Sequence, residues 1–488
     1  MDTSTTADRH GAKGDAPAAA GSLKRDALGV LGILFFVLSA QAPLTGIAGA
    51  VPIAVAIGNG TGVPAAYLAA GAIVLVFSVG FVAMSRYVVD AGAFYRYIGK
   101  GLGRTTGSSS AGVALFAYST IQAAMYGLYG AIVNGLAVTH LGLDVPWWAI
   151  ALGTMAVVQV LGAAGIEMGA KVLAVFVIAE TGILLVFGIV SLVKGGGPEG
   201  LGFAHSFSPA SALDGAPGVA LMFAIASMFG FEATAIYGEE AREPSRTVPR
   251  ATYLSVGLIT AFFAFISWML VSSYGASKAT AAAGTALANG DTTSFVFAPI
   301  GDRLGAWTGD VLPFLLATSL FAGILAFHNS ANRYLFALGR EGLLPRSLSS
   351  LNSRQAPRTA GVVQTGVSVV LVVPFALAGK DPVLSLFSWA SGVAVLAIMT
   401  LYFLTSVSVV VFFRRERYDN RVWNTLVAPV LGALGIAGAI WVILANFTTL
   451  IGGDRITATW LALTVPGVLA LCAALTRLPH ARRALSQD

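Results

Sequence analysis

Two apolar segments of the sequence carry residues that a continuous helix does not favour. The first spans residues 38–58 and contains Pro43, whose ring removes a backbone donor and disfavours helical geometry in the residue before it. The N–H groups of Thr45, Gly46 and Ile47 would then be free at the positive end of a second half-helix. We expect a carboxylate to bind to them.

The second interrupted segment spans residues 224–240 and breaks at Phe229 and Gly230. Backbone carbonyls from Ala226 and Ser227 onward would end the first half-helix, and such carbonyls suit an ammonium group. Gly and Pro also occur as simple kinks in membrane helices. A pair of interruptions at corresponding positions is instead typical of a transporter whose substrate binds near the bilayer midplane.

Two carboxylates stand away from the ends of the apolar segments, Glu180 and Glu232. A charged group at this depth costs about 2.5 to 3.5 kcal/mol, so an unpaired, lipid-facing position is unfavourable. Burial favours the neutral form of a carboxyl group, which suits a proton carrier. We therefore consider Glu180 the leading candidate for ion coupling, against a structural role, and Glu232 a candidate for gating or coupling.

Other polar residues give weaker signals. Tyr118, Gln122 and Tyr126 follow i, i+4, i+8 spacing and would present hydroxyl and amide groups on one face of a helix. Tyr118 and Gln122 are candidate substrate-binding residues, although packing between helices explains the same pattern. Ser391 could line the cavity or allow close helix contact.

The composition is that of a membrane protein. Of 488 residues, 56% are hydrophobic and 11% are charged, and the mean hydropathy is +0.79. This leaves too little polar surface for a water-soluble globule. Cys472 is the single cysteine, which excludes internal disulfides and a cysteine-cluster metal site. We expect neither a metal nor a cofactor.

Apolar stretches long enough to span a bilayer predict twelve transmembrane helices in an all-α polytopic fold. They lie at about 27–57, 63–88, 111–139, 146–166, 169–193, 217–240, 250–274, 309–336, 359–378, 383–413, 424–448 and 456–476. Residues 1–24 are expected to be a disordered cytoplasmic tail, and residues 478–488 a cytoplasmic C-terminal tail.

The distribution of basic residues supports this topology. With both termini in the cytoplasm, 24 of the 29 Lys and Arg residues fall on the inner side and 5 on the outer side. One missed or invented span would exchange the sides of all later loops and remove the bias. The net charge of +6 follows from topology, so nucleic-acid binding is not expected.

Three motifs resemble those of amino acid permeases of the amino acid, polyamine and organocation superfamily. They are AGAFYRYIGKGLG at 91–103, GFEATAIYGEEAREPSRTVPRA at 230–251 and NSANRYLFALGREGLLP at 329–345. The resemblance covers about residues 25–475. It implies a LeuT-type fold, in which helices 1 and 6 are discontinuous and five-helix repeats are inverted.

In that fold the transporter domain covers 25–477, with one repeat at about 27–193, another at about 217–413, and helices 11 and 12 at about 424–476. The resemblance implies that the substrate carboxylate meets the break in helix 1 and the amino group meets carbonyls of helices 1 and 6. Relatives often carry an aromatic gate where this chain has Ala226.

Other classes of protein fit less well. The chain has no phosphate loop and no His-Glu-x-x-His motif, so an ATP-driven pump or a metalloenzyme is not indicated. The resemblance implies a carrier of amino acids, and we expect a secondary active importer in the cell membrane. The buried carboxylates favour proton symport, with sodium left open, and the protein is expected to be a monomer. A polyamine or organic amine carrier is the alternative, and a channel is less favoured.

Overall fold

The computed structural model describes residues 28–88, 93–452 and 454–476. The predicted tails at 1–24 and 478–488 lie outside them. Nine helices among the described residues are long and apolar enough to cross a membrane, and three shorter apolar helices, Trp147–Ala163, Val177–Val193 and Pro217–Ala226, coincide with further predicted segments. The chain is therefore a polytopic helical membrane protein.

The first half of the described chain contains α1 (Val30–Gln41), α2 (Pro43–Thr45), a π-helical turn (Gly46–Ala50), α3 (Val51–Ile57), a 3-10 turn (Gly60–Gly62), α4 (Val63–Ser85), α5 (Ala93–Leu102), α6 (Arg104–Leu141), α7 (Trp147–Ala163), α8 (Ile166–Val193), α9 (Phe203–Phe207), α10 (Pro209–Ala212), α11 (Pro217–Ala226), α12 (Ala233–Ile236) and a 3-10 turn (Tyr237–Glu240).

The second half contains α13 (Pro244–Tyr274), α14 (Ala276–Ala288), α15 (Ser294–Leu304), α16 (Thr308–Arg340), a 3-10 turn (Arg346–Ser349), α17 (Arg358–Leu377), a π-helical turn (Pro382–Phe387), α18 (Ser388–Glu416), a π-helical turn (Trp423–Val427), α19 (Ala428–Ala445), α20 (Phe447–Leu450) and α21 (Arg455–Leu475).

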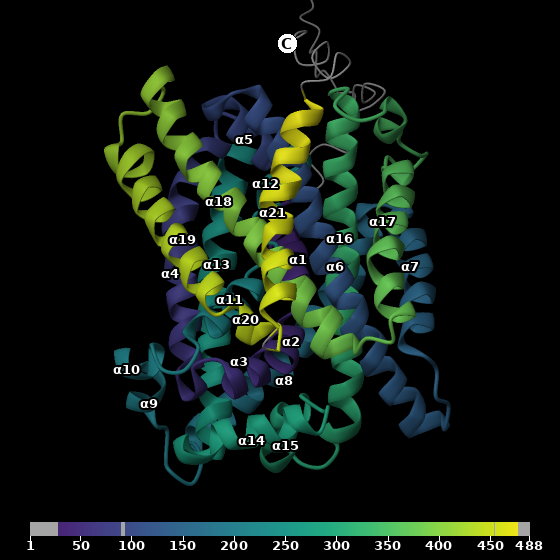
Figure 1. Cartoon of the computed structure of the whole chain (residues 1–488), viewed down its shortest axis with the longest axis vertical. Helices are drawn as coiled ribbons and strands as arrows, with labels where there is room; N and C mark the ends of the chain where they lie inside the picture. The colour runs from purple at the N-terminus through teal and green to yellow at the C-terminus, as the bar shows by residue number, and fades with distance from the viewer. Residues whose placement is uncertain (1–27, 89–92, 453, 477–488) are drawn as a thin grey trace, which may run out of the picture.

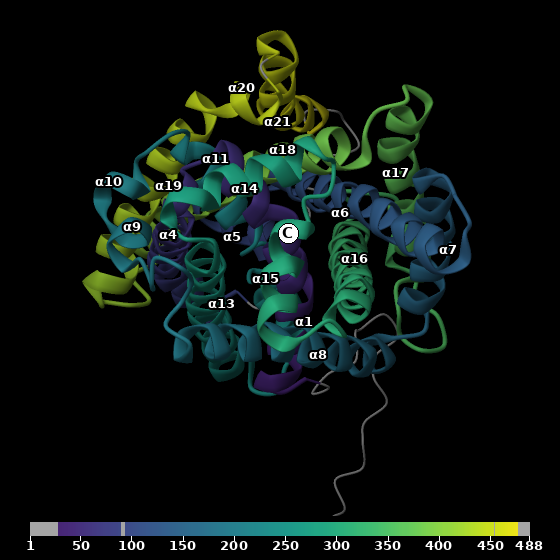
Figure 2. The same cartoon turned by 90° about the horizontal axis from the view of Figure 1, so that it is seen from below.

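The long helices form a bundle in which α6 packs against α16 and α18, and α13 packs against α4. Figure 1 shows the short helices α9, α10, α14 and α15 together at one end and α5 near the other. Seen from the first of these ends, α14 and α15 lie across the middle of the bundle, while α7 and α17, and α19 to α21, lie at its edge (Figure 2).

Small residues permit close approach of the helices. A Cβ atom on Gly71 of α4 would stand 2.7 Å from Cβ of Thr260 on α13, too close for any real contact. Lipid tails are as apolar as leucine, so helices in a bilayer associate through tight packing and not through burial from water. Gly71 thus permits the close approach of α4 to α13 at Thr260.

Polar contacts lie next to the second interrupted segment, at the end of the bundle that carries α5. Leu28 N–H donates to Glu240 O (3.0 Å) and Arg242 N–H donates to Leu28 O (2.8 Å). The Arg333 guanidinium on α16 forms a buried ion pair with the Glu240 carboxylate, with Nε 2.6 Å from Oε1. Its charge also stands over the ring of Tyr237. These contacts join the start of the described chain, α16 and the segment after α12.

Candidate functional site

The first interrupted segment breaks at a single residue. Helix α1 ends at Gln41, Ala42 has left-handed backbone angles (φ 41°, ψ 73°), and Pro43 is the first residue of α2. Proline suits this position because its missing N–H would have no helical partner there. The fixed geometry of Pro43 therefore begins the second half-helix.

The backbone after this break is more regular than the sequence predicted. Gly46 lies in the π-helical turn, and its N–H donates to Ala42 O (3.0 Å), so it is not free to bind a ligand. A Cβ atom on Gly46 would stand 2.6 Å from Cζ of Phe263 and 3.0 Å from Oγ of Ser227. Glycine is required here for close packing, and irregular backbone is not the reason.

The second interrupted segment is longer. Helix α11 ends at Ala226, and irregular turns follow until α12 begins at Ala233. Gly230 has φ 105°, a conformation that side chains disfavour. Of the carbonyls expected to be available, Ala226 O accepts from Phe229 N–H (3.1 Å) and Met228 O accepts from Nε2 of Gln41 (3.3 Å). Gln41 thus links the two interrupted segments.

A cavity of about 40 Å³ lies between the two interruptions, and one water needs about 10 to 15 Å³ by this measure. Four predicted binding residues, Thr45, Gly46, Ala226 and Ser227, contribute to its lining. The other lining residues come from α1, α6, α11, α16 and α18 and from the turns beside them: Gln41, Ala42, Ala50, Ile121, Met125, Phe223, Phe327, Phe387 and Ser391.

The polar side chains of the cavity differ in how well they are paired. Ser227 Oγ donates to Phe223 O (2.9 Å) and is 3.2 Å from the Tyr67 hydroxyl. By contrast, Gln41 Oε1 and Ser391 Oγ are buried and have no hydrogen-bond partner. Buried polar atoms are nearly always paired, so these two are candidates for contacts with a ligand.

Glu180 lies on α8, behind the break in the first segment. Its side chain is fully buried, and its carboxylate faces the N–H of Leu44 in the first turn of α2 and the hydroxyl of Ser319 on α16. Neither carboxylate oxygen has a hydrogen bond of good geometry. Ser319 Oγ is 3.2 Å from Thr45 Oγ1, and Thr45 lines the cavity. A short polar path therefore joins the cavity to Glu180.

Glu232 is held differently, at the end of the second interruption. Its carboxylate accepts hydrogen bonds from the hydroxyls of Tyr118 on α6 and Tyr402 on α18 and from Gly230 N–H, each 3.1 Å long. The side chain is fully buried. These bonds join α6, α18 and the irregular segment. Tyr118 therefore holds Glu232 and does not line the cavity.

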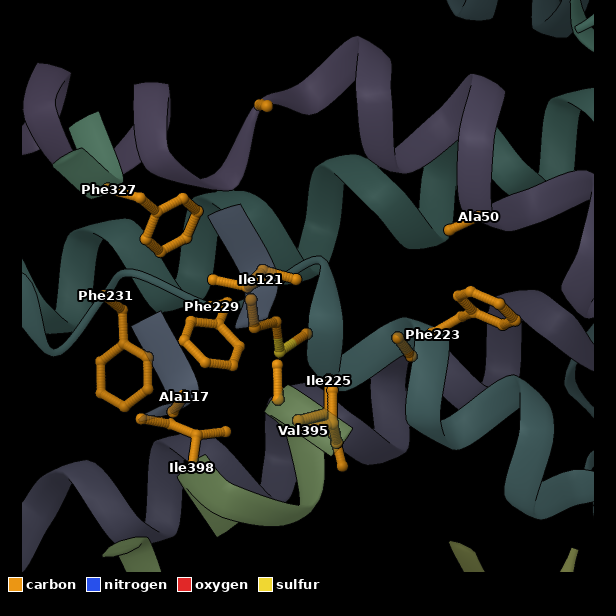
Figure 3. Packing of buried hydrophobic residues seen from close by; sticks show 14 of the residues in the cluster. Ala50, Ala117, Ile121, Phe223, Ile225, Phe229, Phe231, Phe327, Val395 and Ile398 are labelled. Carbon is orange, nitrogen blue, oxygen red and sulfur yellow. The ribbon is translucent and has the colours of Figure 1, made fainter. Parts of the chain in front are cut away.

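The remaining predicted binding residues lie outside the cavity lining. Gln122 Nε2 donates to Ile324 O (3.1 Å), and its Oε1 accepts from Gln364 (2.9 Å), so the side chain joins α6 to α16 and α17. Phe229 packs against Phe327, with ring centroids 5.7 Å apart, and Figure 3 shows it among Phe327, Phe231 and Ile121. Ile47 is fully buried.

Gln41 is the residue that sequence reasoning missed. An amide side chain two positions before Pro43, inside an otherwise apolar segment, was a usable signal. The effect of a proline on free backbone N–H groups concerns only the residues after it, so it does not point to Gln41. The side chain just before the break faces the same cavity.

Interrupted membrane helices around a small cavity define a polytopic membrane protein with a candidate binding site inside the bundle. A sequence model of the amino acid permease family matches residues 28–471. The chain belongs to this family, and the match covers nearly all of the described residues.

Known relatives of the chain are amino acid permeases and transporters. The branched-chain amino acid permease BcaP of Lactococcus lactis is 26% identical over 46% of this chain and 44% of its own length. The human b(0,+)-type amino acid transporter 1 is 22% identical over 58% of this chain and 55% of its own length. The histidine permease of Saccharomyces cerevisiae is 24% identical over 62% and 51%. The aligned part of this chain thus spans about half the length of these relatives.

Proposed function

We propose that the protein is a secondary active transporter that imports an amino acid across the cell membrane by proton symport and alternating access. The observation that carries the proposal is the polar path from the cavity through Thr45 and Ser319 to the buried carboxylate of Glu180. Because a buried carboxylate favours its neutral form, a change of access to water changes its proton affinity.

The position of Glu180 suggests how the proton and the substrate are linked. An ionised Glu180 is stabilised by the positive end of the half-helix that begins at Pro43, through Leu44 N–H. A substrate carboxylate at Thr45 would be stabilised by the same positive helix end, from the side of the cavity. Two anions so close repel each other, so protonation of Glu180 favours substrate binding.

The alternative cargo, a polyamine or other organic amine, has less support. An amine without a carboxylate needs a counter-ion, and neither buried carboxylate lines the cavity. Glu232 is engaged by Tyr118, Tyr402 and Gly230, and Glu180 lies behind α2. An amino acid carries its own carboxylate and so leaves no uncompensated charge.

The proposed topology has twelve crossings in two inverted five-helix repeats, followed by α19 and α21. The two interrupted segments support it because each begins a group of five apolar segments, at Val30–Ile57 and at Pro217–Glu240. The bias of basic residues supports cytoplasmic termini in this proposal. The transporting unit is proposed to be a monomer.

Transport by protein reconstituted in liposomes tests this function. We expect an inward proton gradient to drive accumulation of a labelled amino acid without sodium. Glu180→Gln keeps the size of the side chain and imitates its protonated form. This variant should keep exchange between two pools of substrate and lose gradient-driven accumulation.

Glu243→Gln is the matched control, because Glu243 is an exposed carboxylate outside the bundle interior. It should accumulate substrate as the unmodified protein does. Full gradient-driven accumulation by Glu180→Gln would reject Glu180 as the coupling residue. A strict sodium requirement would reject proton coupling, and the absence of exchange between substrate pools would favour a channel.

A further inference from the structure

The cavity lining carries no charged side chain among the described residues. Its polar groups are Gln41, Thr45, Ser227 and Ser391, and the rest are small or apolar. A charge buried without a partner is strongly unfavourable in such surroundings. A ligand that fills this cavity must therefore balance its own charges or be neutral.

Gln41 is held with its acceptor atom unused. Its side chain is 4% exposed, and its Nε2 donates a hydrogen bond to Met228 O in the other interrupted segment. That bond fixes which end of the amide is donor and which is acceptor. Oε1 is left without a partner in a side chain that lines the cavity. A donor on the ligand would satisfy this atom.

The carboxylate and the ammonium group of a zwitterion match the two helix ends that meet at the break, the start of the half-helix at Pro43 and the end of α1 at Gln41. The positive end of the half-helix at Pro43 suits the carboxylate. Gln41 stands on the other side of the same break, at the C-terminal end of α1, where backbone carbonyls also favour a cation. An ammonium group can donate to Gln41 Oε1, and a charged donor makes this hydrogen bond stronger than a neutral one.

We propose that Gln41 is an ammonium-binding residue and that the cavity selects zwitterionic amino acids with uncharged side chains. The proposal rests on the proposed function and adds the class of substrate. Lysine, arginine, aspartate and glutamate are excluded because their extra charge would meet no partner in the lining. Ser391 Oγ remains as a second unpaired group for the substrate.

Binding of defined amino acids to the purified protein tests the selectivity. L-alanine, L-serine, L-leucine, L-lysine and L-glutamate are compared at equal concentration by thermal stabilisation, since a ligand that binds the folded state raises the melting temperature. We expect the uncharged amino acids to stabilise the protein and L-lysine and L-glutamate to have no effect.

Variants of Gln41 test the role of its acceptor atom. Gln41→Met keeps the length of the side chain and removes the acceptor, and it should weaken binding of the best uncharged amino acid at least about tenfold. Gln41→Glu keeps an acceptor oxygen and should bind that amino acid more tightly than Gln41→Met. Gln159→Met is the matched control, because Gln159 bonds to Arg358 and Thr365 outside the cavity.

The possible outcomes separate this inference from the function on which it rests. Stabilisation by L-lysine or L-glutamate equal to or beyond that by the uncharged amino acids overturns the selectivity and leaves amino acid transport intact. Equal binding by Gln41→Met and the unmodified protein overturns the role of Gln41. If Gln41→Met does not fold, Gln41→Glu is compared with the unmodified protein instead, and loss of binding of the uncharged amino acid by Gln41→Glu overturns the role of the acceptor oxygen. Binding of none of the five overturns the selectivity, whereas the proposed function is decided by uptake in liposomes.

Discussion

At the scale of single residues, the site depends on backbone geometry that few side chains tolerate. Ala42 is held at φ 41°, where a residue with a Cβ pays roughly 1 to 2 kcal/mol relative to a right-handed conformation. Pro43 follows it and Gly46 packs against Phe263 and Ser227. These neighbours hold the turn that exposes the start of α2 to the cavity and to Glu180.

Substitution of Gly46 should remove binding. In Gly46→Val the new side chain meets Phe263 and Ser227 and fills the cavity beside them. Overpacking of this kind also costs about 1 to 3 kcal/mol of stability. We expect no stabilisation by any amino acid and a lower melting temperature. Gly153→Val on α7 is the control, because a Cβ on Gly153 meets nothing within 4 Å; retained binding by Gly46→Val would place the substrate elsewhere.

At the scale of elements, the two interrupted segments work through the helices packed against them. Tyr118 and Tyr402 hold Glu232 between α6 and α18, and Arg333 on α16 holds Glu240 just after α12. The later half of the second segment, from Glu232 to Glu240, is thus fixed to long helices by charged or polar contacts. A movement of α12 relative to α16 must break the pair between Arg333 and Glu240.

The ion pair should therefore show strong coupling between its members. Both side chains are buried, at 5% and 1% exposed, so Glu240→Met leaves the Arg333 charge uncompensated and should cost about 3 to 5 kcal/mol of stability. Arg333→Met combined with Glu240→Met should recover much of this loss. Thermal unfolding of the single and double variants gives the coupling energy. Additive losses would show that the two residues act independently.

The end of α11 should control the size of the substrate. Ala226 lines the cavity at the last residue of that helix. Ala226→Phe adds a ring to a space of about 40 Å³ and should weaken L-leucine binding far more than L-alanine binding. Competition for transport between the two amino acids measures the change, with Ala226→Ser as the conservative control. Unchanged selectivity would mean that the substrate side chain points away from α11.

At the scale of the whole molecule, the distribution of charge and the grouping of short helices indicate the same orientation in the membrane. Loops predicted to lie outside the cell, including α9, α10, α14 and α15, gather at one end of the bundle (Figure 1). Those segments carry few of the 29 Lys and Arg residues. The positive-inside rule therefore predicts that the end of the bundle with α5 faces the cytoplasm.

Chemical labelling in intact cells tests this orientation. Cys472 is the single cysteine, so Cys472→Ser provides a background without thiols. Asn289→Cys after α14 should react with a membrane-impermeant maleimide from outside. Ser353→Cys, between α16 and α17, should react only after the cells are opened. The reverse pattern would contradict cytoplasmic termini.

Residue types and spacing were enough to predict the membrane class, the positions of the apolar helices, the two interruptions and the family. Hydropathy and the effect of Pro43 on its own helix are local or additive properties, so they can be derived without knowing which helices touch. The buried carboxylates were also evident, because an acidic residue within an apolar segment is costly wherever that segment packs.

Only the tertiary structure decided what each polar group faces. Gln122 and Tyr118 lie one turn apart on α6, yet one joins α16 and α17 and the other holds Glu232. Gln41 faces the cavity because its amide reaches Met228, which is 187 residues away in the chain. Such pairings depend on the rotation and approach of separate helices, and the hydropathy pattern of one helix does not contain that information.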